Sequence, residues 1–386
     1  MKPTILINFA LVKQLYLDNA ATTPMLPEVI ALITESMTTI YGNPSSVHQI
    51  GRKAKAMVET ARKNIAKQFN ATASEIVFTA GGSEADNLIL RNAVTNLGVK
   101  TIISSKIEHH AVLHTIKQLE KEFEVTVKWI DLNEYGSVDL DHLEALLKSS
   151  EDKKIVSLMY VNNEIGNILN IEKVGKLCLQ NSALFHTDAV QAVGHIQFNA
   201  TFIDFFAASA HKFHGPKGVG FAFIKKGFGI QPLLFGGEQE RGARAGTENV
   251  HAIVGMEKAL QLSIDQLNTD GTSIKNLKSY LIENLKTNFP TIQFNGLTSE
   301  DKASSHILNV RFDTEYPMLL FNLDLKGIAV SGGSACQSGS SKGSHVLNTI
   351  LNENDAKNTS LRISFSKLNT LEELDYFIEI LKMYVK

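Results

Sequence analysis

Two apolar runs near the middle of the chain carry the clearest pattern in the sequence. The first spans residues 183–186, and the second spans residues 203–208 with Asp204 as its polar interruption. Both runs have the length of a strand and are bounded by polar or glycine residues, which predicts two buried strands. Asp188 follows the first run and Lys212 follows the second. Side chains at strand ends converge on one cleft in open α/β sheets, so we expect this aspartate and lysine to meet.

Strand and helix patterns alternate along the first two thirds of the chain. Residues 47–69 repeat apolar positions with the helical period, which predicts an amphipathic surface helix. Residues 75–90 have the pattern of a strand, a glycine turn and a helix, and further strands are expected at 101–104 and within 155–166. This alternation favours the α/β class. We expect one large domain over residues 16–268.

A second, smaller domain is expected after the turn-forming cluster T-D-G-T at residues 269–272. Beyond it, the pattern predicts helices and strands at residues 274–289, 307–312, 317–325, 328–331 and 360–365, followed by a final helix. Thr370 and Glu373 form a capping-box pattern at the start of that last helix. We therefore place a small α+β domain at residues 269–386, and we expect the N-terminal arm, residues 1–15, to dock on it.

The overall composition is that of an ordinary globular protein. The 386 residues are 44% hydrophobic and 20% charged, and the net charge is −2. This charge gives no reason to expect nucleic acid or an anionic membrane as the main partner. No apolar run approaches the roughly 20 residues of a membrane span. Two cysteines in so long a chain favour a reducing compartment, so we expect a cytoplasmic protein.

The expected meeting of Asp188 with Lys212 suggests pyridoxal phosphate (PLP) chemistry. In PLP enzymes a lysine forms the Schiff base with the cofactor, and a carboxylate keeps the pyridine nitrogen protonated so that the ring accepts electrons. A buried ion pair between two strands is the alternative that this spacing leaves open.

A glycine turn upstream has the features of a phosphate site. Gly81 and Gly82 allow a ligand to approach the backbone closely, and Ser83 is expected to cap the following helix. No G-K-[ST] follows, so this is not a P-loop, and an ordinary strand-to-helix connection is the alternative. Residues 241–249 combine glycine and arginine as an anion-binding loop does, or as a solvated charged turn does.

Histidines and cysteines offer further candidates. His110 and His114 are spaced i, i+4, which is one element of a zinc site, but no thiolate or carboxylate completes the ligand spacing, so we expect no metal. A single ring stacked on a cofactor is the alternative role. Cys178 lies in a helical core pattern and is expected to be inert. Cys336 lies in residues 331–344, where ten of fourteen residues are Gly or Ser, which predicts a mobile loop with an exposed thiol, or a linker with an incidental cysteine.

The motifs together resemble one family. The segments S-A-H-K-F-H-G-P-K-G (209–218) and H-T-D-A-V-Q (186–191) are similar to the cofactor-lysine region of cysteine desulfurases, the NifS/IscS-like branch of the class V aminotransferases. E-H-H-A-V, R-A-G-T-E-N and S-A-C-Q-S match further motifs of that branch. The resemblance extends over about residues 15–380.

The resemblance implies an aspartate-aminotransferase-like PLP fold (fold type I), with a mostly parallel seven-stranded sheet and a small α+β domain. It also implies a role for each matching residue. His109 would stack on PLP, Asn163 and Gln191 would contact its ring oxygen, and Asp188 its nitrogen. The phosphate would be held by Gly82, Ser83, Ser209, His211 and, across a homodimer, Thr247. Arg362 and Asn163 would bind the substrate carboxylate, and the catalytic residues would be Lys212, Cys336, His109 and Asp188.

The implied reaction removes sulfur from L-cysteine, releases L-alanine and leaves a persulfide on Cys336. Acceptor proteins would then take the sulfur for iron–sulfur cluster assembly or tRNA thiolation. A selenocysteine lyase or another class V aminotransferase is the alternative enzyme, since it would share Lys212 and Asp188 without needing Cys336. A catalytically idle scaffold is a further alternative, although such a protein would be expected to lose Lys212 or Cys336.

Overall fold

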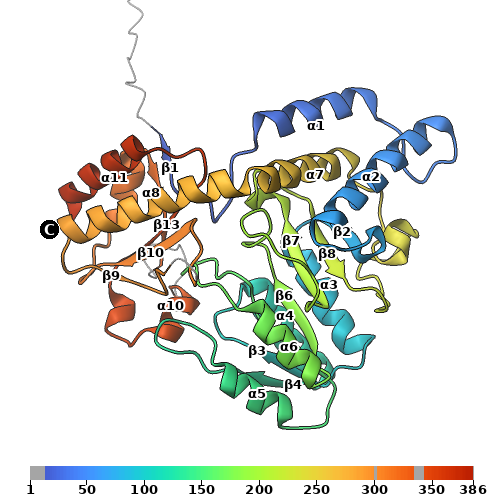
Figure 1. The fold of residues 1–386 in the computed structure, drawn as a ribbon, viewed down its shortest axis with the longest axis horizontal. Coiled ribbons are helices and arrows are strands. Elements are labelled where there is room, and N and C mark those ends of the chain that lie inside the picture. Colours follow the sequence, from blue (N-terminus) through green and yellow to red (C-terminus); the bar gives the residue numbers. More distant parts are fainter. Residues whose placement is uncertain (1–13, 300–301, 334–342, 386) are drawn as a thin grey trace, which may run out of the picture.

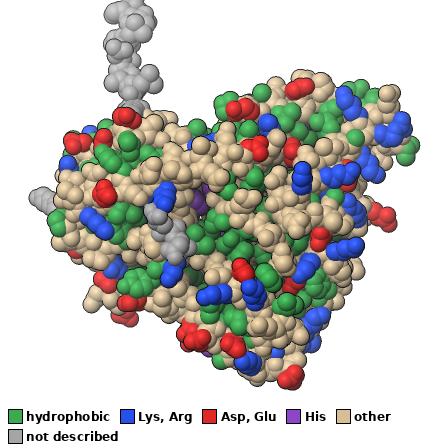
Figure 2. Space-filling view, viewed as in Figure 1, with side chains coloured by type: hydrophobic (Ala, Val, Ile, Leu, Met, Phe, Trp, Pro, Cys, Tyr) green, Lys and Arg blue, Asp and Glu red, His purple; other side chains and the backbone are tan. Residues whose placement is uncertain are grey.

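A computed structural model of the chain describes residues 14–299, 302–333 and 343–385 (Figure 1). Two lobes are visible, one built on a large sheet and one on a smaller sheet. The N-terminal arm lies almost wholly outside the described residues, and so does Cys336. Acidic and basic side chains are interspersed over the face in Figure 2, as the small net charge predicts. Among the helices described, none is both long enough and apolar enough to cross a membrane.

The larger lobe contains a seven-stranded sheet, which confirms the mostly parallel α/β architecture expected from the sequence. Strand β8 is antiparallel to both of its neighbours, and the other pairings are parallel. The strand order across the sheet is β2 (Ile76–Thr79), β8 (Gly220–Ile224), β7 (Phe205–Ser209), β6 (Leu184–Asp188), β5 (Lys154–Ser157), β3 (Thr101–Ser104) and β4 (Thr126–Trp129).

Alternation along each strand divides the large lobe into two hydrophobic layers. On β7, Phe206 and Ala208 belong to one buried cluster, whereas Phe205 and Ala207 belong to the other. Successive strand residues point to opposite faces, so a strand buried on both sides is apolar throughout. Helices α2 (Gln49–Gln68), α5 (Leu140–Lys148), α6 (Ile171–Gln180) and α7 (Val250–Asp265) contribute to the first layer, and α3 (Gly82–Thr95) and α4 (His110–Phe123) to the second. Helix α1 (Pro27–Thr39) packs on α7.

The smaller lobe has its own core around an antiparallel sheet. The order of this sheet is β12 (Ser331–Gly332), β13 (Ser360–Ser364), β10 (Ile307–Arg311) and β9 (Gln293–Phe294). The N-terminal strand β1 (Leu15–Tyr16) pairs with β11 (Ile328–Ala329), so Leu15 and Leu17 join this core. The helices of this lobe are α8 (Leu267–Asn288), α9 (Leu319–Leu325), α10 (His345–Ile350) and α11 (Leu371–Tyr384).

Three predicted elements have different bounds in the structure. The predicted turn at residues 269–272 lies inside α8, which begins at Leu267 because Ile274, Leu277 and Leu281 bury one face of a helix long enough to include it. The strand expected within 155–166 ends at Ser157, and the strand expected at 328–331 is divided between β11 and β12. The capping box of Thr370 and Glu373 is formed at the start of α11. The domain bounds at 268 and 269 stay a prediction.

A buried ion pair fixes the helix α2 to the edge of the large sheet. The Arg62 guanidinium donates to both carboxylate oxygens of Glu240, at 2.6 and 2.7 Å, and also to the carbonyl of Ile76 at 2.9 Å. Glu240 accepts in addition from the backbone N–H of Phe78 at 2.8 Å. The pair therefore holds β2 in place and anchors the segment that leads to Thr247.

We predict that Glu240→Ala lowers the free energy of unfolding by about 3 kcal/mol, because Arg62 would lose its buried partner and keep only the partly exposed Glu59. Urea denaturation measures the change. Glu144→Ala is the matched control, since Glu144 pairs with Lys148 on an exposed helix face, and its loss should cost less than about 1 kcal/mol. Equal effects for the two variants would contradict a structural role for the Arg62–Glu240 pair.

Candidate active site

A cavity of about 380 Å³ opens at the carboxyl ends of β6 and β7, where the sequence predicts it. The structure brings ten of the predicted residues to its walls: Gly82, Ser83, His109, Asn163, Asp188, Gln191, Ser209, His211, Lys212 and Arg362. Five further residues line it that the sequence analysis did not single out: Ala20, Ala21, Asp86, Met159 and Val190. A larger neighbouring cavity of about 540 Å³ contains none of the predicted site residues.

Lys212 is held at the cavity wall by two backbone carbonyls. It ends a short 3₁₀ turn after β7, and its Nζ donates to the carbonyl oxygens of Ala20 at 2.7 Å and Ala21 at 2.8 Å. Burial, with a contribution from the nearby charge of Arg362, lowers the pKa of Lys212 to about 8. An amine with this pKa loses its proton readily near neutral pH, so Lys212 can act as a nucleophile and as a base.

Asp188 is the last residue of β6 and faces a second buried acid. Its Oδ1 accepts from the backbone N–H of Val190 at 2.9 Å, and burial raises its pKa although His109 and Lys212 act in the opposite direction. Burial raises the pKa of Asp86 well above its usual value, and the charge of Asp188 adds to that rise. We infer that Asp86 keeps its proton, because two buried carboxylates this close do not both ionise easily. Asp86 lies one helical turn after Gly82, a spacing that could have identified it from the sequence.

His109 is fixed as a neutral ring at the start of α4. It is the N-cap residue, and its Nδ1 accepts from the backbone N–H of Ala111 at 3.1 Å. Burial lowers the pKa of His109, which favours the neutral ring. Because Nδ1 accepts a hydrogen bond, the single proton of the neutral ring lies on Nε2. His110 and His114 instead stack on each other, with ring centroids 4.9 Å apart, and neither lines the cavity.

The N-terminus of α3 forms one end of the cavity. The N-cap is Gly81 rather than Ser83, which corrects the sequence prediction, and no side chain caps the helix. A methyl group on Gly82 would lie 2.4 Å from Val190 Cγ2, so only glycine fits. Ser209 lines the same cavity, and His211, whose pKa burial lowers to about 4, contacts Thr22. Uncapped amides, hydroxyls and a neutral imidazole make this end suitable for a phosphate group.

Thr247 does not reach this cavity within one chain. It is exposed and lines a separate hollow of about 150 Å³ together with Arg244 and Gly246. The contribution to the phosphate that its sequence motif predicts would therefore have to come from another chain.

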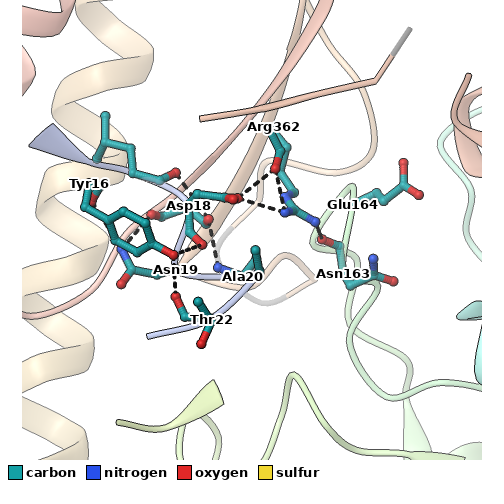
Figure 3. A network of polar contacts seen from close by, with 12 residues as sticks. Tyr16, Asp18, Asn19, Ala20, Thr22, Asn163, Glu164 and Arg362 are labelled. Carbon is teal, nitrogen blue, oxygen red and sulfur yellow. Dashed lines mark hydrogen bonds and ion pairs between the residues drawn. The ribbon is translucent and has the colours of Figure 1, made fainter. Parts of the chain in front are cut away.

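Arg362 enters the cavity from the smaller lobe, on β13 (Figure 3). Its Nη1 donates to the carbonyl of Asn163 at 3.0 Å, and its Nη2 donates to Asp18 at 2.8 Å and to Ser331 at 3.0 Å. Its Nε is buried and has no hydrogen-bond partner among the described residues. A guanidinium on the wall of a polar cavity is suited to bind a carboxylate.

The structure describes one of the two cysteines, Cys178, and this residue is buried. Cys178 lies on the buried side of α6, 1% exposed, and burial raises the pKa of its thiol, which keeps it in the unreactive form. Cys336 lies outside the described residues, so its predicted role as a nucleophile stays a prediction.

The residues in the cavity fit PLP. The uncapped N-terminus of α3 at the cavity wall suits a phosphate, Lys212 has a lowered pKa, and Asp188 offers a buried carboxylate to a pyridine nitrogen. The Gln191 side chain donates to the carbonyl of Ala20 at 2.8 Å, which fixes its amide at the wall.

Comparison with known proteins agrees with this class of site. A family model described as "Aminotransferase class-V" matches residues 15–377, and the chain belongs to this family. Cysteine desulfurase IscS of Clostridium botulinum is 41% identical over 97% of this chain and 95% of its own length. Among solved structures, a NifS-like protein is 35% identical with a TM-score of 0.87, covering 96% of this chain and 99% of its own. The structure titled "SspA in complex with cysteine" is 30% identical with a TM-score of 0.80, covering 92% and 100%.

We predict that reductive methylation of Lys212 in the cofactor-free protein has its midpoint near pH 8, since its pKa is lowered to about 8. Below this pH the amine is protonated and unreactive, and above it the amine reacts. Peptide mass spectrometry follows the modification. In urea the midpoint should return to about 10.4, because unfolding removes the desolvation. A folded-state midpoint above pH 10 would contradict the burial of this amine.

Proposed function

We propose that this protein is a PLP-dependent cysteine desulfurase, which converts L-cysteine to L-alanine and carries the released sulfur as a persulfide. The observation that carries the proposal is the convergence of Lys212, Asp188 and Arg362 on one cavity, in a chain 41% identical to a cysteine desulfurase. A solved relative whose title names bound cysteine supports the same substrate.

The residues around the cavity would divide the binding of PLP among them. The α3 N-terminus with Ser83, Ser209 and His211 would hold the phosphate, His109 would lie against the ring, and Asp188 would bind the ring nitrogen. When bound, PLP supplies an aldehyde that joins to amines and a ring that withdraws electrons from the substrate. Lys212 provides the amine that attaches the cofactor to the protein.

The substrate would be oriented from the opposite side of the cavity. The Arg362 guanidinium would donate hydrogen bonds to the carboxylate of L-cysteine, and Asn163, whose carbonyl accepts from the same guanidinium, would border that position. Lys212 would then remove the Cα proton, since its lowered pKa makes the free amine available near neutral pH.

Cys336 would perform the sulfur step. Its thiolate attacks the sulfur of the substrate, so that an S–S bond forms while the Cβ–S bond breaks. The electron pair of the broken bond stays with Cβ, which takes up a proton to become the methyl group of L-alanine. The persulfide on Cys336 would pass its sulfur to acceptor proteins for iron–sulfur cluster assembly or tRNA thiolation.

We also propose that the active enzyme is a homodimer. Thr247 is exposed and too remote to line the cavity of its own chain, as a residue that serves a neighbouring chain would be. Large apolar side chains are exposed on and beside α1 and α2, where Figure 2 shows hydrophobic surface: Ile30, Met37, Tyr41, Val47 and Ile50. Such a surface favours contact with another protein chain.

The central test replaces each cysteine in turn. Cys336→Ala should release no sulfide or L-alanine above about 1% of the parent level, because the attacking thiolate is missing. It should still exchange the Cα proton of L-cysteine with solvent deuterium, because that proton moves through Lys212. Cys178→Ala is the control and should keep both reactions, with a loss of packing stability only. Parent-level sulfur release by Cys336→Ala would favour a selenocysteine lyase or another class V aminotransferase.

A mixing experiment tests the shared site. Lys212→Ala and Thr247→Ala proteins should each be impaired, whereas mixed dimers contain one site in which both residues are intact. We expect activity to rise above that of either variant after subunit exchange. A monomeric mass for the active protein in light scattering would contradict the homodimer.

A further inference from the structure

Asp18 is a charged residue in contact with Arg362 of the cavity wall, and the reaction described above gives it no role. It follows β1 in the segment Y-L-D-N-A-A-T-T and is partly buried, with 19% of its side chain exposed. Its carboxylate Oδ1 accepts from Arg362 Nη2 at 2.8 Å and from the Ser331 hydroxyl at 2.8 Å (Figure 3). Asp18 is therefore the carboxylate partner of the guanidinium that faces the cavity.

The backbone holds Asp18 rigidly beside Arg362. Asp18 forms an isolated parallel bridge with Ser364, two residues after Arg362 on the same strand, and the Ser364 N–H donates to Leu17 at 2.7 Å. The Ala20 N–H donates to the Ser364 hydroxyl at 2.8 Å, and the Tyr16 hydroxyl donates to the Asp18 carbonyl at 3.1 Å. A carboxylate fixed in this way can orient a long, flexible side chain without itself losing much freedom on ligand binding.

The contacts of Arg362 determine which of its N–H groups are available to a ligand. A guanidinium has five N–H groups, and among the described residues Asn163 is the partner of Nη1, whereas Asp18 and Ser331 are partners of Nη2. Both edges with which arginine can form a two-pronged contact include Nη2, and Nη2 already has two partners, Asp18 and Ser331. A substrate carboxylate that forms this two-pronged contact would therefore compete with Asp18 and Ser331 for Nη2. Ser331 is the partner that can leave, because its hydroxyl is neutral and keeps its bond to Asp18.

We propose that Asp18 is the positioning residue for Arg362: its carboxylate holds the guanidinium at the cavity wall, while Ser331 yields its place on Nη2 to the carboxylate of the substrate. The inference rests on the proposed function, in which Arg362 binds the substrate carboxylate. Asp18 acts through Arg362 and takes no part in the chemistry. The charge of Asp18 also offsets that of Arg362 at Lys212, where the two act on the pKa in opposite directions.

Equilibrium binding of L-alanine to the PLP-loaded protein tests the proposal, with cofactor absorbance as the readout. L-Alanine carries the carboxylate but no sulfur, so its binding does not depend on desulfuration, and a failure of the proposed function leaves this test intact. Ethylamine, the same amine without the carboxylate, is the second probe. A substitution that changes the affinity for L-alanine but not for ethylamine therefore affects the contact with the carboxylate.

Asp18→Ala should weaken L-alanine binding on the order of 10-fold, because the freed guanidinium must be ordered when the ligand binds. Ethylamine binding should stay within about 2-fold of the parent, which also shows that the variant is folded and loaded. Asp18→Asn keeps an oxygen acceptor and should recover part of the affinity. L-Alanine binding by Asp18→Ala that equals or exceeds that of the parent would overturn the proposal, as would equal losses for both probes.

Two further variants sharpen the comparison. Ser331→Ala frees one Nη2 hydrogen and should bind L-alanine at least as tightly as the parent, so weaker binding would contradict the displacement of Ser331. Asp131→Ala removes an exposed carboxylate that pairs with His142 far from the cavity, and it should change neither probe.

Discussion

The active-site cavity depends on one turn, residues 18–23, which contacts functional side chains from both lobes. Its carbonyls at Ala20 and Ala21 accept the Lys212 ammonium from the larger lobe, and its Asp18 carboxylate binds Arg362 from the smaller lobe. Thr23 adds bonds to the carbonyl of His211, beside the lysine. The relative positions of the amine and the guanidinium are therefore set by a few hydrogen bonds to a short piece of backbone.

Burial shifts the pKa values of the ionisable groups in and around the cavity and so determines which of them are protonated. Asp86 and Asp188 both line the cavity, and burial raises the pKa of each. His186, on β6 behind the cavity, has its pKa lowered to about 3 and stays neutral. Desolvation thus favours neutral acids and neutral imidazoles together. A cavity of this kind can hold protons near the substrate without accumulating net charge.

The sequence predicted the class of fold and most of the cavity because those features follow from local pattern. Apolar runs located β6 and β7, and the residues at their ends, Asp188 and Lys212, converge as expected. Predictions from local pattern were wrong where packing with distant residues determines the secondary structure. The T-D-G-T segment is helical in α8 because the helical turns that follow it are buried. Asp18 was missed for a related reason, since its importance comes from Arg362, which the fold places beside it. The capping role assigned to Ser83 was wrong because Gly81, two residues earlier, is the N-cap residue of α3.

The near-continuity of α7 and α8 has a mechanical consequence. The first helix packs on α1 and α2 in the larger lobe, the second contributes to the core of the smaller lobe, and Gln266 alone separates them. Lys367, just beyond β13, donates to Gln266 at 2.5 Å and pairs with Asp270 at 3.0 Å. A rotation of one lobe against the other would have to bend the chain at Gln266 and would distort the contacts of Lys367 with Gln266 and Asp270. The two helices therefore limit changes in the distance between Arg362 in the smaller lobe and Lys212 in the larger lobe.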